Sequence, residues 1–221
     1  MSARLQIDVF FDFICPWCLI GKRQLERAQA LLLSQQPGVQ IITQWHGVQL
    51  LPHMPVGGQP FAEFYSRRLG SAEAVSQRQS QVQQAANAVG VSIDFSRIAT
   101  MPNTADAHRL LERANQLGSP EQRDALLERL YGAYFQQGED LGCRQTLLAI
   151  AQDCGFEVAA LEDCLRGDGQ EFVGNGAGAA SGVPCFQFDR HLTMVGAQPA
   201  EALLGAMREA LLESQRERQP A

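Results

Sequence analysis

Hydrophobic residues in the first quarter of the chain change their spacing twice. Residues 5–13 form a run of aliphatic, β-branched and aromatic side chains, which is typical of a buried strand. From Pro16 the apolar residues recur every three or four positions, as on one face of a helix, until Pro37 and Gly38 interrupt the pattern. Residues 39–48 again have strand character. A strand, a helix and a second strand in this order predict a parallel βαβ unit.

The middle of the chain has the spacing of successive helices. Residues 50–60 contain three prolines and two glycines, so we expect no regular structure there. Thr104 and Ser119 are the expected N-caps of two helices, and Pro120 suits a first helical position. The expected helices cover 61–70, 71–90, 104–118, 119–138, 143–155 and, in a short form, 158–167. The expected C-cap glycines are Gly70, Gly90, Gly118, Gly138 and Gly155.

The pattern returns to strands near the C-terminus. A glycine- and alanine-rich stretch at 174–182 precedes two short strand-like segments, 183–189 and 191–196, and an amphipathic helix closes the chain. The order of elements predicts an α/β domain interrupted by an all-helical insertion. We place the two parts of the α/β domain at residues 1–50 and 175–221, and the insertion at residues 60–170.

The composition of the chain limits which partners it can bind and in which compartment it is expected. The chain has 221 residues, of which 45% are hydrophobic and 19% charged, with a net charge of −6. It has no basic stripe interleaved with aromatic residues, which argues against nucleic-acid binding. It also has no apolar run long enough to span a membrane and no secretory signal at its N-terminus. We therefore expect a cytoplasmic protein that does not bind nucleic acid or membranes.

Two of the six cysteines, Cys15 and Cys18, lie where the first strand gives way to the helix. Six cysteines are too few for a disulfide scaffold, so a close pair is more typical of catalysis or metal binding. Unpaired N–H groups and the helix dipole favour an anion at a helix start. Cys15 is therefore expected to form a thiolate more readily than a free cysteine, whose pKa is about 8.5.

The spacing assigns different roles to the two thiols. Cys18 lies about one turn beyond Cys15, so the two sulfur atoms can close a disulfide. We expect Cys15 to be the exposed, attacking thiol and Cys18 to be the resolving thiol. Pro16 stiffens the helix start, and Trp17 is expected to form an apolar plate on the surface that binds a peptide.

A zinc site is the main alternative for a CxxC pair. Zinc usually takes four ligands, often from a second CxxC or an HxxxH motif. The remaining cysteines and the four histidines are dispersed along the chain. We therefore expect no metal and no cofactor.

Several segments are shared with one known family. They are CPWCLIGKRQLE (15–26), PNTADAHRLLERA (102–114), YGAYFQQGEDLG (131–142), SGVP (181–184) and GAQPAE (196–201). With them the chain resembles the DsbA family of thiol–disulfide oxidoreductases, and in particular its FrnE-like branch. The resemblance implies a thioredoxin-like fold interrupted by a helical domain, with catalytic Cys15 and Cys18. It also implies a cis peptide bond at Pro184, where the backbone of Val183 pairs with substrate.

Related enzymes in the same superfamily use glutathione. Kappa-class glutathione transferases and 2-hydroxychromene-2-carboxylate isomerases typically have Ser in place of Cys15. They also tend to have Asn in place of Leu51 and Ser-Asp in place of Ala197 and Gln198. These departures favour disulfide exchange. FrnE-like proteins usually have an aromatic residue after the cis proline, where this chain has Cys185.

Other residues near the motif have two interpretations each. Asp12 is either a partly buried carboxylate that accepts a proton from the resolving thiol or a solvent-facing residue. His108 either lines the substrate cleft or packs as a hydrogen-bonded histidine. Cys185 either forms an alternative disulfide or packs inward. Lys22 and Arg23 are expected on a solvated helix face.

The three cysteines of the helical block are expected to behave as small apolar residues. A second disulfide, such as one between Cys143 and Cys154, requires their Cα atoms to lie within about 7 Å. Cys164 could take part in the same way.

The hypothesis from the sequence is a thiol–disulfide oxidoreductase that acts on thiol- or disulfide-bearing proteins or small thiols, including glutathione. A monomer and a homodimer are both compatible with the sequence. One alternative is a glutathione-dependent isomerase or transferase. The other is a redox-sensing or chaperone-like binding module.

Overall fold

The computed structural model describes residues 3–174 and 182–217. Most of the glycine- and alanine-rich stretch expected at 174–182 therefore lies outside the described residues. Contacts between Cα atoms divide the chain into two compact units. The first unit comprises Met1–Phe11, Trp17–Val48 and Gly174–Ala221, and the second comprises Asp12–Pro16 and Gln49–Val173.

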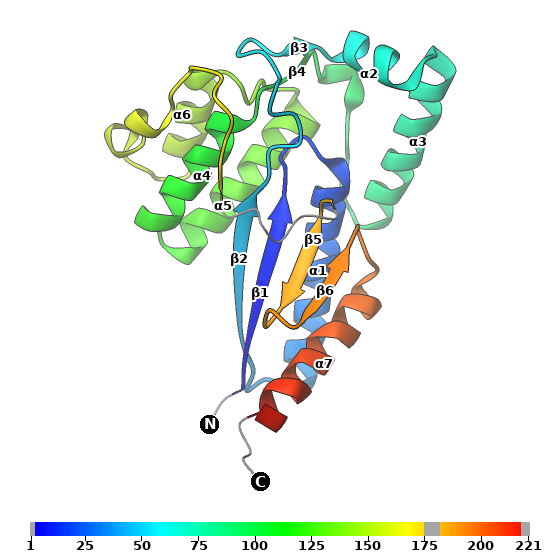
Figure 1. Cartoon of the computed structure of the whole chain (residues 1–221), viewed down its shortest axis with the longest axis vertical. Helices are drawn as coiled ribbons and strands as arrows, with labels where there is room; N and C mark the ends of the chain where they lie inside the picture. The colour runs from blue at the N-terminus through cyan, green and yellow to red at the C-terminus, as the bar shows by residue number, and fades with distance from the viewer. Residues whose placement is uncertain (1–2, 175–181, 218–221) are drawn as a thin grey trace. The chain divides into compact units, whose positions relative to one another are not determined.

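The first unit is built on a four-stranded sheet in the order β2-β1-β5-β6 (Figure 1). Its strands are β1 (Arg4–Phe11), β2 (Gln40–Gly47), β5 (Cys185–Phe188) and β6 (Leu192–Val195). Strands β1 and β2 are parallel and are joined by helix α1 (Pro16–Gln35), which confirms the expected βαβ unit. Strands β5 and β6 continue the sheet in antiparallel pairing.

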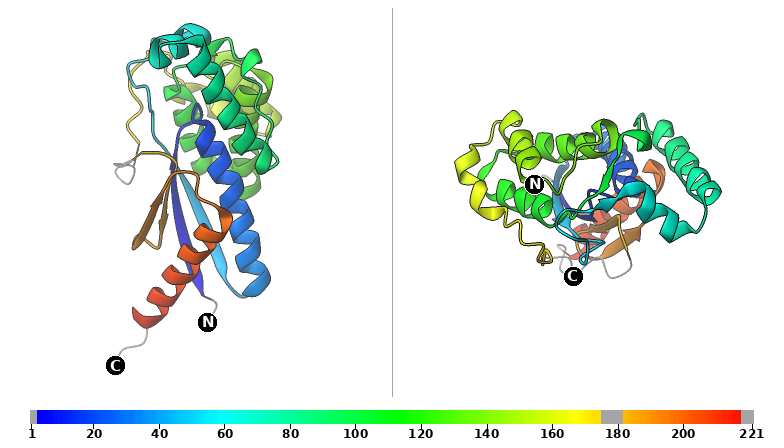
Figure 2. Two further views of the ribbon diagram at one scale, coloured as in Figure 1. Left: turned by 90° about the vertical axis from the view of Figure 1, so that its right-hand side faces the viewer. Right: turned by 90° about the horizontal axis from the view of Figure 1, so that it is seen from above.

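Alternation along β1 directs one set of its side chains into the core. Leu5, Ile7 and Val9 are at most 1% exposed and pack with apolar residues of α1 and of helix α7 (Ala200–Glu217). Figure 2 shows α1 running alongside β1 and β2. Burying each such side chain stabilises the fold by about 1.5–3 kcal/mol relative to leaving it exposed.

The second unit is mainly helical. Its helices are α2 (Phe61–Leu69), α3 (Ala72–Ala88), α4 (Ala105–Leu117), α5 (Pro120–Gly132) and α6 (Arg144–Asp153). Its shorter turns are η1 (Phe95–Arg97), η2 (Ala133–Gln137), η3 (Val158–Ala160) and η4 (Glu162–Cys164). Leucines of α4 and α5 with almost no exposure form much of its core, among them Leu110, Leu126 and Leu130.

The second unit differs in three places from the expected all-helical block. Strands β3 (Gln59–Pro60) and β4 (Thr100–Met101) form a short antiparallel pair. The expected helix over 158–167 is replaced by the two 3-10 turns η3 and η4. The expected helix over 119–138 changes into the π-helical turn η2.

The helix ends confirm some expected caps and correct others. Ser119 forms a capping box with Gln122, and Pro120 opens α5 as expected. Thr104 makes no capping hydrogen bond with its side chain, because the Oδ1 atom of Asn103 accepts the Ala105 N–H at 3.0 Å instead. Gly118 is the expected C-cap that does not adopt a left-handed conformation, since its φ is −88°.

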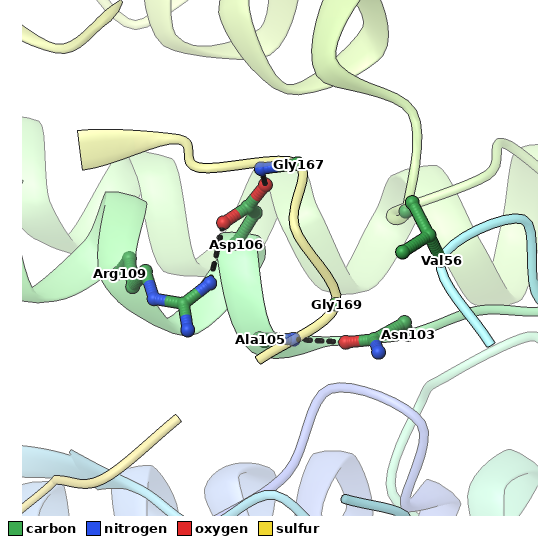
Figure 3. Close-up of a pocket in the computed structure, with 8 residues that line it drawn as sticks. Val56, Asn103, Ala105, Asp106, Arg109, Gly167 and Gly169 are labelled. Carbon is green, nitrogen blue, oxygen red and sulfur yellow. Dashed lines mark hydrogen bonds and ion pairs between the residues drawn. The ribbon is translucent and has the colours of Figure 1, made fainter. Parts of the chain in front are cut away.

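Asp106 and Arg109 of α4 fix the segment through which the chain leaves the second unit (Figure 3). The carboxylate of Asp106 accepts the backbone N–H groups of Arg166 and Gly167 at 3.0 and 2.8 Å. It also accepts a hydrogen bond from Nη1 of Arg109 at 2.7 Å. Nη2 of Arg109 donates to the Gln170 carbonyl at 2.6 Å. This buried pair is therefore engaged in holding the backbone.

Candidate active site

Cys15 lies immediately before the first residue of α1. Strand β1 ends at Phe11, and the Cys15 N–H closes a turn by donating to the Asp12 carbonyl at 3.2 Å. Pro16 occupies the first helical position, where its missing N–H would have had no helical partner. The chain thus presents the Cys15 thiol at the end of a 20-residue helix where backbone N–H groups favour a negative charge.

Cys15 and Cys18 are not joined in a disulfide in the structure. Cys18 is the third residue of α1, about one helical turn beyond Cys15. Cys15 is 7% exposed and Cys18 is 1% exposed. Cys15 is the more accessible of the two, but the expectation of an openly exposed thiol is wrong, because little of its surface reaches solvent.

Asp12 is completely buried and pairs with His108. Its Oδ1 atom lies 3.0 Å from Nε2 of His108, and both side chains are 0% exposed. Its Oδ2 atom accepts the Leu50 N–H at 2.7 Å. The solvent-facing interpretation of Asp12 is therefore wrong, since both oxygens of the carboxylate are bound inside the second unit.

The His108 ring packs between two aromatic rings. Its centroid lies 5.0 Å from that of Phe13 and 5.2 Å from that of Phe172. A side chain enclosed in this way does not line a cleft. The structure thus favours the packing interpretation of His108 over the expected substrate contact.

Two tyrosines of the second unit interact electrostatically with the same segment. Burial, followed by the charge of the Cys15 thiolate, raises the pKa of Tyr65 above 10.0. Burial, followed by the charges of Tyr65 and Asp12, raises the pKa of Tyr134 well above its usual value. Both phenols are therefore protonated at neutral pH.

The proline loop packs on α1 within the first unit. The Val183–Pro184 peptide bond is cis. A Cβ atom placed on Gly21 would lie 3.0 Å from Cγ of Pro184 and 3.0 Å from Cζ of Phe186. Gly21 follows Cys18 by one turn, so the loop lies beside the first turns of the helix that carries Cys18. Sequence analysis did not identify Gly21, although a glycine inside a helical pattern is a signal of close packing.

Cys185 follows the proline but is on the other side of the sheet from α1. Phe186 and Phe188 pack in the core with α1 and α7. Side chains alternate along β5, so Cys185 points to the opposite face, where it pairs in register with Phe10. It is 1% exposed, and burial raises the pKa of its thiol. This placement supports inward packing over an alternative disulfide.

The amino-acid sequence of the chain matches that of a known family. The model of the DSBA-like thioredoxin domain matches residues 6–208. The chain belongs to this family.

Solved structures and a curated protein resemble this DSBA-like chain. A probable DsbA oxidoreductase from Streptomyces coelicolor is 26% identical, with a TM-score of 0.79 over 98% of this chain and 92% of that one. The cytosolic disulfide reductase DsbM from Pseudomonas aeruginosa, solved with GSH, has a TM-score of 0.56 at 19% identity over 96% of this chain and 99% of that one. The protein YwbO of Bacillus subtilis (strain 168) is 22% identical over 73% of this chain and 72% of its own length. These matches confirm the expected thioredoxin-like fold.

The residues between and after the two cysteines of this DSBA-like domain differ in exposure. Pro16 and Trp17 are half-buried, which leaves part of each residue accessible. Lys22 was expected on a solvated face, but its side chain is 7% exposed and its ammonium pairs with Glu26. Its long aliphatic stem explains this burial, because such a stem packs on apolar surface while the charged end is paired.

All six cysteines lie within the described residues, and none of them forms a disulfide there. Cys143 and Cys154 flank the two ends of α6, roughly 16 Å apart at 1.5 Å per residue. This separation exceeds the limit of about 7 Å for a disulfide. A Cys143–Cys154 disulfide is therefore incompatible with this DSBA-like domain.

Two further properties concern only residues 3–174 and 182–217. Among them, no three His, Cys, Asp or Glu side chains are grouped so that they could hold a metal ion. None of the helices in this part of the chain combines the length and apolar character needed to cross a membrane.

Proposed function

We propose that the chain is a thiol–disulfide oxidoreductase in which Cys15 is the nucleophile and Cys18 the resolving thiol. The observation that carries the proposal is the position of Cys15 directly before α1, with Cys18 one turn into the same helix. Thiolates are the reactive form of cysteine, and a helix N-terminus stabilises them. Membership of the DSBA-like family supports the same chemistry.

The reaction consists of two exchanges at sulfur. The Cys15 thiolate attacks one sulfur of a substrate disulfide, forms a mixed disulfide and releases the first substrate thiolate. The Cys18 thiolate then attacks the Cys15 sulfur, breaks the mixed disulfide and releases the second substrate thiolate. The substrate gains two electrons and the Cys15–Cys18 pair is oxidised to a disulfide. An external thiol returns the pair to its reduced form, and oxidation of a substrate dithiol follows the same steps in reverse.

Substrate contacts in this proposal come from the residues around the pair. Pro16 and the accessible part of Trp17 supply an apolar surface, and the backbone at Val183 and Pro184 orients the substrate chain. The substrates are thiol- or disulfide-bearing proteins or small thiols. The Pseudomonas aeruginosa reductase, which is cytosolic and was solved with GSH, supports glutathione as the small thiol and the cytoplasm as the compartment. The proposal needs no metal or other cofactor and applies equally to a monomer or a homodimer.

Insulin reduction and oxidation of a dithiol peptide test this function. The assays compare the wild type with Cys15→Ser and Cys18→Ser. We expect both variants to lose turnover, and Cys18→Ser to accumulate a mixed disulfide through Cys15 that mass spectrometry detects. Wild-type protein that catalyses neither reaction would overturn the proposal.

The same variants separate the alternative functions. A glutathione-dependent isomerase or transferase would keep turnover in Cys18→Ser, because only one sulfur or the bound glutathione is then needed. A redox-sensing or chaperone-like module would still bind an unfolded client after Cys15→Ser. If either result is obtained and disulfide exchange is not detected, the corresponding alternative function replaces the proposed oxidoreductase.

A further inference from the structure

Helix α3 of the second unit has two sides of different character. Val82 and Ala86 are its buried residues, and they lie one turn apart on the same side of the helix. The opposite side borders a hollow of about 510 Å³, which is within the usual size range of ligand pockets. We call this hollow the α3 groove. Its lining residues are Ala74, Gln77, Arg78, Ser80, Gln81 and Gln84.

The length and polarity of the α3 groove match a short stretch of polypeptide. Its glutamines offer amide donors and acceptors, which complement the N–H and C=O groups of a peptide backbone. Ala74 and Gln84 are ten positions apart, so the groove is about 15 Å long at a rise of about 1.5 Å per residue. An extended chain covers this length with about four or five residues, at roughly 3.3 Å each.

The α3 groove lies in a positively charged segment of the chain. Residues 61–90 have three arginines and two glutamates, and thus a net charge of +1, whereas the whole chain has a net charge of −6. Arg78 lines the groove, and its Nη1 atom donates to Oε1 of Gln81 at 2.9 Å. A groove with a guanidinium and neutral amides along its length complements a segment that carries carboxylates.

Tyr65 of α2 links the groove to Cys15 within the second unit. Burial raises the pKa of the Tyr65 phenol most strongly, and the charge of Cys15 raises it further. The charges of Arg68 and Arg78 lower the same pKa. Charges influence one another appreciably only within about 10 Å at ordinary salt concentrations. The Cys15 sulfur and the two guanidinium groups therefore surround one phenol.

Aromatic packing along α2 positions Arg68 beside this phenol. The guanidinium carbon of Arg68 lies 5.9 Å from the centroid of the Phe64 ring. The Phe64 ring in turn meets the Tyr65 ring edge-on, with 5.3 Å between their centroids. Arg68 and Arg78, from two successive helices, thus place positive charge on the same side of the second unit as Cys15.

We propose that the α3 groove, together with Arg68, binds an acidic segment of a disulfide-bearing protein while Cys15 attacks the disulfide of that protein. The inference rests on the proposed function and narrows its substrates to proteins with acidic residues near the disulfide. The arginines pair with carboxylates of the substrate, and the glutamines bind its backbone. Arg68 and Arg78 are specificity-determining residues, because they contact the substrate away from the reacting sulfur atoms.

Two synthetic peptides, each with one disulfide, test the proposal. One has a run of glutamates on each side of the disulfide, and its twin has glutamines at the same positions. We expect the reduced protein to reduce the glutamate peptide at least about fivefold faster in single-turnover experiments at low salt, because carboxylates pair with the two arginines. The preference should disappear in about 1 M NaCl, where the Debye length is about 3 Å.

Variants separate recognition of the substrate from an effect on the thiolate. Arg68→Gln/Arg78→Gln should bring the rates for the two peptides to within about twofold of each other by slowing only the glutamate peptide. Arg166→Gln, which changes an exposed arginine elsewhere in the second unit, should keep the wild-type preference. Equal slowing of both peptides in the double variant would overturn the proposal, since the arginines would then act on Cys15. An equally large loss with glutathione disulfide would also overturn it, because the groove would then serve a small thiol.

Binding without reaction gives a second measurement on wild-type protein. In a version of the glutamate peptide with serines in place of its cysteines, no exchange can occur. We expect this peptide to shift the amide NMR signals of residues 74–84 of 15N-labelled protein more than the corresponding glutamine peptide does. Equal or absent shifts would overturn the proposal. Wild-type protein that reduces neither disulfide peptide would instead count against the proposed function, and the NMR titration would still decide whether the groove binds acidic peptides.

Discussion

The ring of Pro184 packs directly against Gly21 of α1. A Cβ atom on Gly21 would lie 3.0 Å from Cγ of this proline and the same distance from Cζ of Phe186. Neither neighbour is the free end of a flexible side chain, because one is a proline ring and the other a buried core ring. The cis-proline loop therefore depends on a residue without a side chain at position 21.

Gly21→Ala should lower the free energy of unfolding by about 1–3 kcal/mol, because the added methyl group overpacks this contact. Urea denaturation measures the change. Gly205→Ala in α7 is the matched control, since nothing lies within 4 Å of a Cβ atom there. The control should gain up to about 1 kcal/mol from the higher helix propensity of alanine. Equal gains in both variants would contradict the packing argument.

Asp106→Asn should destabilise the protein by about 3 kcal/mol. The substitution removes one partner of a buried ion pair and places an amide N–H₂ group against backbone donors. Thermal unfolding measures the loss, and limited proteolysis should show faster cleavage within residues 166–171. Glu162→Gln changes a more exposed carboxylate that pairs with Arg144 at 3.9 Å, so it should stay within about 0.5 kcal/mol of the wild type.

Ser119→Ala should cost about 1 kcal/mol by removing the cap of α5. The Ser119 hydroxyl accepts the Gln122 N–H at 3.2 Å, and the Gln122 side chain accepts the Ser119 N–H in return. Denaturation in urea provides the measurement. Ser34→Ala near the end of α1 is a control on an exposed serine whose hydroxyl only donates to a carbonyl. A similar loss in the two variants would show that the capping box contributes nothing specific.

Cys143 should be alkylated before Cys164 at pH 8.5. Hydrogen bonding from the Thr146 N–H at the start of α6 lowers the pKa of Cys143 below 9.0. Burial, followed by the charges of Asp163 and Asp106, raises the pKa of Cys164 to about 11. Since iodoacetamide reacts with thiolates, the lower pKa gives the larger reactive fraction, and less than about 1% of Cys164 is ionised at this pH.

Mass spectrometry of Cys15→Ser/Cys18→Ser protein follows this labelling without interference from the Cys15 and Cys18 thiols. Raising the pH to 10.5 should accelerate labelling of Cys164 far more than that of Cys143. Labelling of Cys164 ahead of Cys143 at pH 8.5 would exclude the assigned environments.

Local signals in the sequence predict the framework of the site. The run of apolar residues before Cys15, the change of period at Pro16 and the interruption at Pro37 locate both ends of β1 and α1 to within two residues. Ser119 and Pro120 likewise mark the start of α5, because an N-cap and a first-turn proline are local signals of a helix start. Each of these signals depends on neighbours within one or two turns.

The features that could not be predicted from the sequence depend on contacts between residues that are far apart along the chain. Asp12 and His108 are 96 residues apart, and neither position indicates that they meet. Strand alternation alone does not decide whether the Asp12 side chain points into the core or to solvent. The burial of Lys22 likewise depends on which residues pack over its aliphatic stem. Asn103 replaces Thr104 at the start of α4 because the backbone before the helix brings the amide oxygen to the Ala105 N–H.

The side of the sheet on which Cys185 lies has a consequence for chemical fidelity. A third sulfur one residue from the proline loop could compete for the mixed disulfide and divert electrons into dead-end products. The hydrogen-bonded strands form a partition between that sulfur and the helix that carries Cys18. The strand backbone would thus separate this additional thiol from the proposed exchange reaction at Cys15 and Cys18.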